Sequence, residues 1–181
     1  KTRSFQVQVS GSIPLSRSIT LPRLVRGLPF MKTKYQQLYM DWAHRAAELS
    51  HARRLKVGAV IVKDDVVIYG YNGMPAGWDN NCEEHPKVVN KQTYAIEEDT
   101  TRLVTRPEVL HAESNAIAKL AKSPNVGNGA DLFVTHSPCI HCAKLIFQSG
   151  IRRVFYGANY RDDAGVQFLR SSGITVTQIE E

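Results

Sequence analysis

Two short segments of the chain contain residue types that bind metal ions and move protons. The first runs from His111 to Glu113 and the second from Pro138 to Cys142. Cys139 and Cys142 are three residues apart, so their sulfur atoms share one face of a first helical turn, where the helix dipole favours thiolates. Two thiolates and the His111 imidazole fill three corners of a zinc tetrahedron and leave the fourth for water, as in a catalytic zinc site.

Glu113 lies two residues beyond His111, a position that suits a proton carrier better than a fourth ligand. A carboxylate beside the bound water can accept its proton and return it to a leaving group. The combination of His-x-Glu with Pro-Cys-x-x-Cys resembles the signature of zinc deaminases. A structural zinc knuckle, a zinc-binding interaction module or a thioredoxin-like redox site are the alternatives, but none of them needs Glu113.

The hydrophobic pattern predicts the elements that must position these residues. Apolar residues recur at helical spacing from Tyr35 to Leu49, and two β-branched runs at 57–62 and 66–69 form an antiparallel hairpin. Helices and strands then alternate, which implies parallel strands joined by crossovers. We expect an α/β protein with three α/β/α layers and a mixed five-stranded sheet, with these further elements: helix 111–122, strand 131–135, helix 139–149, strand 152–156, helix 162–172 and strand 174–178.

The chain has 181 residues and a formal net charge of +6, and the charge is unevenly distributed. Residues 1–30 hold five basic residues and no acidic one, so 18 basic and 17 acidic residues remain in 31–181. We expect 1–30 to be an extension outside the fold, either upstream sequence preceding a start at Met31 or a targeting arm, and 31–181 to be the catalytic domain. The near-neutral domain argues against a nucleic-acid footprint.

The cysteine content and hydropathy predict a reducing compartment and no membrane span. Three cysteines are an odd number, and no apolar run approaches 18 residues. We therefore expect a cytoplasmic protein. The long polar segment 72–107 shows no period and is expected to be a functional loop.

Five segments together resemble deoxycytidylate (dCMP) deaminases of the cytidine deaminase superfamily, over about residues 33–178. The segments are Val57–Val62, Gly70–Pro75, His111–Ile117, Ser137–Ile146 and the Tyr160-Arg-Asp stretch. The resemblance implies hydrolytic deamination of dCMP to dUMP and ammonia, which supplies thymidylate synthesis. Zinc would be held by His111, Cys139 and Cys142, with Glu113 moving protons.

The resemblance also implies positions for the substrate. Asn72 matches an asparagine that hydrogen-bonds the sugar, and the backbone of Ser137 matches a contact to the exocyclic amine. We expect Arg54, and less directly Tyr160, to bind the 5′-phosphate, because a phosphate needs cationic or hydroxyl donors. The alternatives are a turn role for Asn72 and solvated surface positions for Arg54 and Tyr160.

Many members of this group are homohexamers activated by dCTP and inhibited by dTTP, each with Mg²⁺. The segment beginning at Gly73 is similar to their effector loop, and its glycines would let backbone N–H groups approach phosphates. The expected effector residues are Gly73, Met74, Pro75, Gly77 and Trp78. The alternative is an ordered loop with Trp78 covering the core.

Two further interpretations remain open. Some relatives hold a second zinc in this region, but only Cys82, with His85 and the helical His44 and His51, is available here, so we do not expect one. The main alternative function is a zinc deaminase acting on a polynucleotide, either tRNA adenosine or single-stranded cytidine, supported only by the basic residues 1–30.

Overall fold

The computed structural model describes residues 31–125 and 127–180, and a five-stranded sheet is its central element. The strand order is β2 (Val66–Tyr71), β1 (Gly58–Lys63), β7 (Asp131–His136), β8 (Arg153–Ala158) and β9 (Thr175–Gln178). Residues 1–30, including the expected N-terminal extension, lie outside the described residues. In the described part, no helix is both long and apolar enough to cross a membrane.

The sheet is mixed, as the sequence predicts. β1 pairs antiparallel with both β2 and β7, while β7, β8 and β9 are parallel. The β1–β2 turn places Asp64 and Asp65 at positive φ of 48° and 64°, which a tight hairpin requires and aspartate tolerates. The parallel pairs are joined through α3 (Ile140–Gln148) and α4 (Ala164–Ser171), so both crossovers start at one edge of the sheet.

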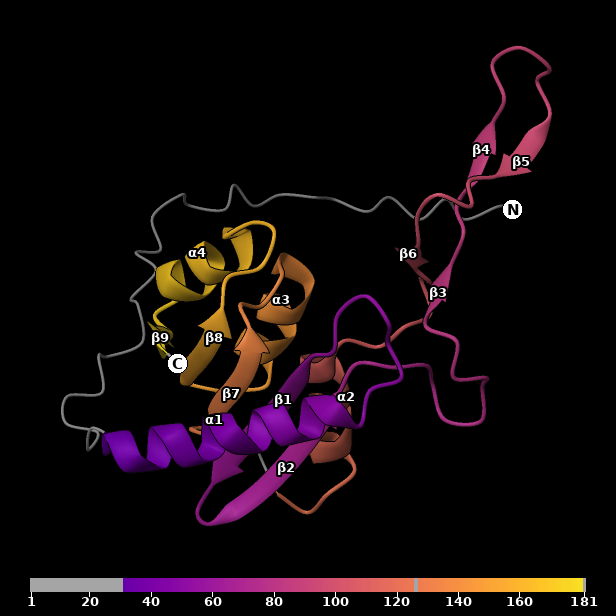
Figure 1. The fold of residues 1–181 in the computed structure, drawn as a ribbon. Helices are drawn as coiled ribbons and strands as arrows, with labels where there is room; N and C mark the ends of the chain where they lie inside the picture. Colours follow the sequence, from indigo (N-terminus) through magenta and orange to yellow (C-terminus); the bar gives the residue numbers. More distant parts are fainter. Residues whose placement is uncertain (1–30, 126, 181) are drawn as a thin grey trace, which may run out of the picture. The chain divides into compact units, whose positions relative to one another are not determined.

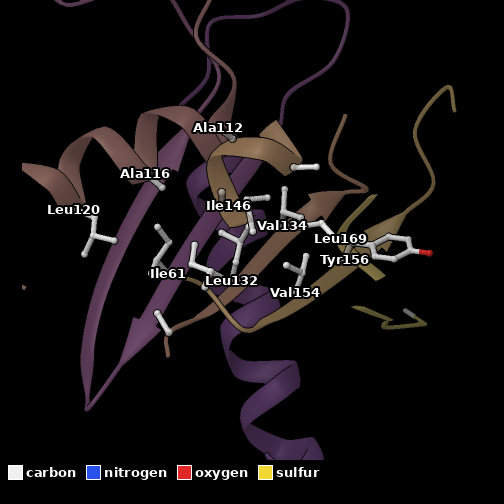
Figure 2. Close-up of a cluster of buried hydrophobic side chains, with 14 of the residues drawn as sticks. Ile61, Ala112, Ala116, Leu120, Leu132, Val134, Ile146, Val154, Tyr156 and Leu169 are labelled. Carbon is white, nitrogen blue, oxygen red and sulfur yellow. The ribbon is translucent and has the colours of Figure 1, made fainter. Parts of the chain in front are cut away.

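Different helices cover the two faces of the sheet (Figure 1). α1 (Thr33–Glu48) packs with Met40 and Ala43 against Val60, Phe133 and Phe155. The opposite face packs against α2 (Ala112–Ala121), α3 and α4 (Figure 2). Its buried residues include Ile61, Leu132, Val134, Ile146, Val154 and Leu169. These two cores establish the three expected layers.

The segment 72–107 is more ordered than the expected loop. It contains two short antiparallel ladders, one between β3 (Glu83–Glu84) and β6 (Val104–Thr105) and one between β4 (Lys87–Val89) and β5 (Ile96–Glu98). Strands of two or three residues bury too little apolar surface to impose a hydrophobic period. The prediction of an unpatterned loop was therefore wrong for these strands, which rest on backbone hydrogen bonds.

Gly70 on β2 is a point where the sheet and α2 approach closely. A Cβ atom at this position would collide with the backbone of Ala112 and Ala116. We expect Gly70→Ala to lower the free energy of unfolding by about 2 kcal/mol, because α2 must move away. The measurement is urea unfolding, with Gly73→Ala as the control, since its Cβ would lie 3.9 Å from the Tyr71 side chain. Equal midpoints for the two variants would contradict this packing constraint.

Candidate active site

The first turns of α2 and α3 bring the predicted metal ligands together. His111 is the N-cap of α2, Cys139 is the N-cap of α3, and Cys142 lies in the first turn of α3. The Nδ1 atom of His111 lies 3.6 Å from Sγ of Cys139 and 3.4 Å from Sγ of Cys142. The three ligand atoms all lie within 4.8 Å of one another, so a single ion can contact all of them.

These three side chains fit a zinc ion in both chemistry and spacing. Zinc prefers sulfur and imidazole donors, and bond lengths of about 2.0–2.3 Å place tetrahedral donors about 3.5–3.8 Å apart. The separations between His111 and the two cysteines lie close to that range. Among the described residues, this is the group of three or more His, Cys, Asp or Glu side chains that could hold a metal.

The charges within the site favour a bound cation. A hydrogen bond from Cys142, assisted by His111, lowers the pKa of Cys139 to about 3, so that a thiolate is present at neutral pH. The same hydrogen bond, in which the Cys142 thiol is the donor, and burial both raise the pKa of Cys142. A metal ion bound by both sulfur atoms would displace the shared proton.

Glu113 occupies the position that a proton carrier requires. It lies in the first turn of α2 and is 4% exposed. Burial raises its pKa above the ordinary value for glutamate, which makes the carboxyl group a better proton acceptor. Glu113, His111 and Cys139 all line one cavity of about 570 Å³, so the carboxylate and the metal ligands face the same space.

Asn72 lines this cavity, but its side chain also has a structural role. Its Oδ1 accepts a hydrogen bond from the Val57 N–H (2.8 Å), and its Nδ2 donates to the Leu55 carbonyl (2.8 Å). These bonds fix the chain segment that leads into β1. One hydrogen of Nδ2 is left over, because an amide nitrogen carries two donors.

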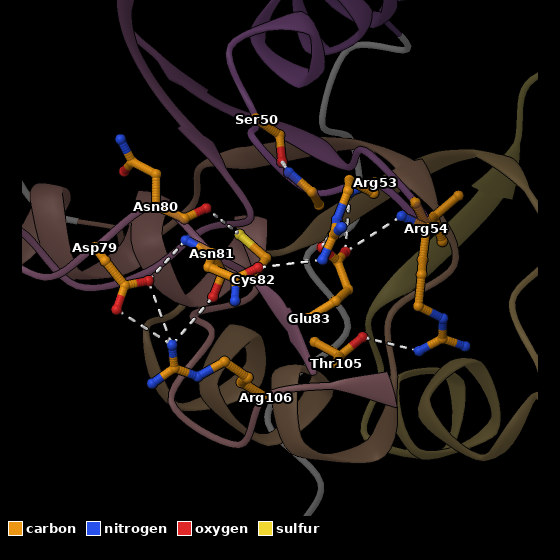
Figure 3. Close-up of polar contacts among 12 residues, drawn as sticks. Ser50, Arg53, Arg54, Asp79, Asn80, Asn81, Cys82, Glu83, Thr105 and Arg106 are labelled. Atoms are coloured by element: carbon orange, nitrogen blue, oxygen red, sulfur yellow. Dashed lines mark hydrogen bonds and ion pairs between the residues drawn. The ribbon is translucent and has the colours of Figure 1, made fainter. Parts of the chain in front are cut away.

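Ser137, Tyr160 and Arg54 also line the cavity, so the structure gathers all four expected substrate residues around one space. Ser137 is buried, and its Oγ accepts a hydrogen bond from the Tyr160 N–H (2.7 Å). Arg54 donates from Nη1 to Oγ1 of Thr105 (3.0 Å), as Figure 3 shows. Sequence reasoning missed Thr105, whose contact arises from the β3–β6 ladder.

Arg161, the arginine of the Tyr160-Arg-Asp stretch, is a second arginine of the cavity, and the sequence predicted no role for it. Its guanidinium carbon lies 5.5 Å from the centroid of the Tyr160 ring. Its place in the sequence next to Tyr160, a predicted phosphate-binding residue, was the signal that could have identified it. Arg54 and Arg161 also line an adjoining cavity of about 620 Å³ together with Arg102 and Arg106. Arg102 pairs with Asp99 and Arg106 with Asp79, so those two charges are already compensated.

The expected effector residues lie beside this cavity and do not line it. Gly73 exchanges two backbone hydrogen bonds with Leu110, the residue before His111. Met74 packs against the cluster of Ala52, Cys82 and Val109. Gly77 has a φ of 89°, and Trp78 is 54% exposed, so about half of its surface remains accessible.

Two of the residues considered for a second zinc, Cys82 and His85, have other contacts, and His51 lies beyond the end of α1, contrary to the expectation that it is helical. The buried Cys82 thiol donates to the Asn80 carbonyl at 3.6 Å. Nδ1 of His85 lies 2.9 Å from the Arg102 carbonyl oxygen. Both side chains therefore stabilise the 72–107 segment.

The chain is similar in sequence and in fold to proteins of one family. Residues 33–158 match the cytidine and deoxycytidylate deaminase zinc-binding region. ComE operon protein 2 of Bacillus subtilis is 36% identical over 151 residues, which cover 82% of this chain and 73% of that protein. The deoxycytidylate deaminase of Mycobacterium phage D29 is 38% identical over 123 residues, or 67% of this chain and 93% of that enzyme.

A solved structure agrees along its whole length. The crystal structure of the dCMP deaminase from cyanophage S-TIM5 in complex with dCMP and dUMP superimposes with a TM-score of 0.71 at 36% sequence identity. The match covers 83% of this chain and 100% of that chain. The likeness therefore includes both the sheet and the elements that carry the metal ligands.

The ligand set predicts which cysteines determine metal content. We expect about one zinc per chain, and Cys139→Ser or Cys142→Ser to lose most of it, because serine is a poor zinc ligand. Cys82→Ser is the matched control and should keep its zinc. Atomic emission on dialysed protein gives the ratio. Loss of zinc from Cys82→Ser, or full retention in the other two variants, would contradict the assignment.

Proposed function

The chain belongs to the cytidine and deoxycytidylate deaminase family of zinc-dependent enzymes, and we propose that it hydrolyses dCMP to dUMP and ammonia. The observation that carries the proposal is the shared cavity. The metal ligands His111 and Cys139 line it with Glu113, and so do two arginines without a carboxylate partner among the described residues, Arg54 and Arg161. A ligand with a deaminable base and a phosphate matches these two sets of residues.

The reaction places distinct demands on the residues of this chain. Zinc held by His111, Cys139 and Cys142 would supply a Lewis acid that activates the attacking water. Glu113 accepts a proton from the water and delivers it to N3 of the cytosine as the new C4–O bond forms. It then accepts the proton of the new C4 hydroxyl group and passes it to the exocyclic amine, so that the C4–N bond breaks, the C4=O bond forms and ammonia leaves. The raised pKa of Glu113 suits both transfers.

The remaining cavity residues can orient the nucleotide. The Ser137 backbone lies at the end of β7 beside the metal ligands, where it can contact the exocyclic amine. Asn72 offers its spare amide hydrogen to the sugar. Arg54 and Arg161, together with the Tyr160 hydroxyl, can bind the 5′-phosphate, because two cations match a phosphate dianion.

Replacing Glu113 tests the proton-transfer role directly. We expect Glu113→Gln to lower kcat for dCMP by about 10³-fold or more while zinc content is unchanged, because the amide cannot accept the proton. The measurement is loss of cytosine absorbance in zinc-replete buffer. Glu48→Gln on the exposed face of α1 is the control and should match the wild type. Near-native turnover by Glu113→Gln would rule out the assigned mechanism.

The substrate class needs a parallel comparison. We expect turnover of dCMP to exceed that of deoxycytidine, because the two arginines bind only the phosphorylated molecule. A cytosine-containing single strand should not be deaminated. Turnover of the strand without turnover of dCMP would instead support the polynucleotide alternative, although the zinc chemistry would be the same.

The proposal extends to regulation by dCTP and dTTP with Mg²⁺ in a homohexamer. Support comes from the Gly73–Leu110 backbone pair, which links the 73–78 segment to the residue preceding His111. A nucleotide bound at Gly73, Met74, Pro75, Gly77 and Trp78 could thereby shift the start of α2. The three cysteines form no disulfide, which suits the proposed cytoplasmic location.

Regulation predicts a change in the shape of the rate curve. We expect dCTP with Mg²⁺ to lower the dCMP concentration at half-maximal rate and dTTP with Mg²⁺ to raise it. Initial rates against dCMP concentration, with and without each effector, provide the measurement. Three superimposable hyperbolic curves would remove the regulatory proposal and leave the catalytic one intact.

A further inference from the structure

Glu83 is a buried acidic residue that the proposed chemistry does not use. It belongs to β3 and is 2% exposed, although it lines the same cavity as the metal ligands. We propose that Glu83 is a positioning residue that sets the affinity for the substrate phosphate by holding Arg54 in place. This inference rests on the proposed dCMP deaminase function.

The Glu83 carboxylate fixes the backbone of Arg54. Its Oε1 accepts hydrogen bonds from two consecutive backbone groups, the N–H of Arg53 at 2.9 Å and the N–H of Arg54 at 3.2 Å. These groups belong to the segment between α1 and β1, about 30 residues away in the sequence. A buried carboxylate that accepts both N–H groups orients the segment, because each would otherwise be left without a partner.

The same ladder holds the other end of the Arg54 side chain. Its guanidinium donates to Thr105 Oγ1 at 3.0 Å, and Thr105 is paired with Glu83 across the β3–β6 ladder. Figure 3 shows Glu83 and Thr105 contacting the two ends of Arg54. Backbone and guanidinium are thus fixed by adjacent residues of one small element, which reduces the conformational freedom lost when an anion binds.

The distribution of charge leaves Arg54 available to an anion. Nε of Arg53 lies 3.5 Å from Oε2 of Glu83, so the neighbouring arginine compensates the buried carboxylate. Among residues 31–125 and 127–180 that oxygen has no hydrogen-bond partner, so the contact with Arg53 is its main compensation. Arg54 makes no ion pair among the described residues, and it lines both adjoining cavities. Glu83 therefore orders Arg54 without occupying its charge.

The first experiment separates phosphate binding from chemistry. We expect Glu83→Ala to raise KM for dCMP at least about tenfold while kcat stays within about twofold, because only a binding interaction is weakened. Glu83→Gln keeps a carbonyl acceptor for the two N–H groups and should show a smaller rise in KM. Glu84→Gln, an exposed neighbour on the same strand, is the matched control and should behave as the wild type. If Glu83→Ala loses its zinc or the circular dichroism signal of the folded protein, the KM of Glu83→Gln alone decides whether Glu83 affects phosphate binding.

The second experiment tests whether Glu83 acts through Arg54. We expect Arg54→Gln to raise KM for dCMP, and Glu83→Gln or Glu83→Ala added to it to change KM by less than about twofold further, since coupled residues are not additive. A Glu83 substitution that raises KM for dCMP as strongly in the Arg54→Gln background as in the wild type would overturn the inference. So would a fall in kcat with KM unchanged.

The outcomes distinguish this inference from the function on which it rests. A wild-type protein that deaminates dCMP, with effects of Glu83 and Arg54 that multiply, overturns only the positioning role. A zinc-replete wild-type protein that leaves dCMP unchanged overturns the proposed function and this inference with it.

Discussion

The structure depends on holding the first turns of two helices against one point in space. His111 begins α2 and Cys139 begins α3, yet α2 follows the 72–107 segment and α3 follows β7. Their meeting requires α2 to press on β2 at Gly70 and α4 to press on the Pro138–Cys139 backbone at Gly165, where any Cβ atom would collide. The two hydrophobic cores on either side of the sheet keep these contacts rigid.

Chemistry and recognition come from different parts of the fold. The metal ligands and Glu113 lie on helices packed against the sheet, so their spacing is fixed by the core. The arginines of the cavity lie on connecting segments, where Arg54 is ordered by a two-residue ladder and Arg161 by an aromatic ring. Such a division allows the connecting segments to change substrate specificity while the sheet and its helices preserve the geometry of the metal ligands and Glu113.

Sequence reasoning succeeded where the signal is local. The succession of helices and strands follows from the hydrophobic period, and the two cysteine ligands follow from their spacing within one helical turn. It missed Glu83, Thr105 and Arg161, because their roles depend on pairing between residues far apart in the chain and leave no periodic trace. It also could not foresee that the Asn72 amide would bond the backbone at Leu55 and Val57, since side-chain contacts of that kind depend on tertiary structure.

The paired backbone groups of Gly73 and Leu110 bring together the two ends of a long excursion of the chain. The polypeptide leaves β2 at Gly73 and returns to the metal centre at Leu110, directly beside the point where it left. A closed loop of this kind can gain or lose residues at little entropic cost, because the closure term grows only with the logarithm of length. Residues between Gly73 and Leu110 can therefore be inserted or deleted during evolution while α2 keeps its position.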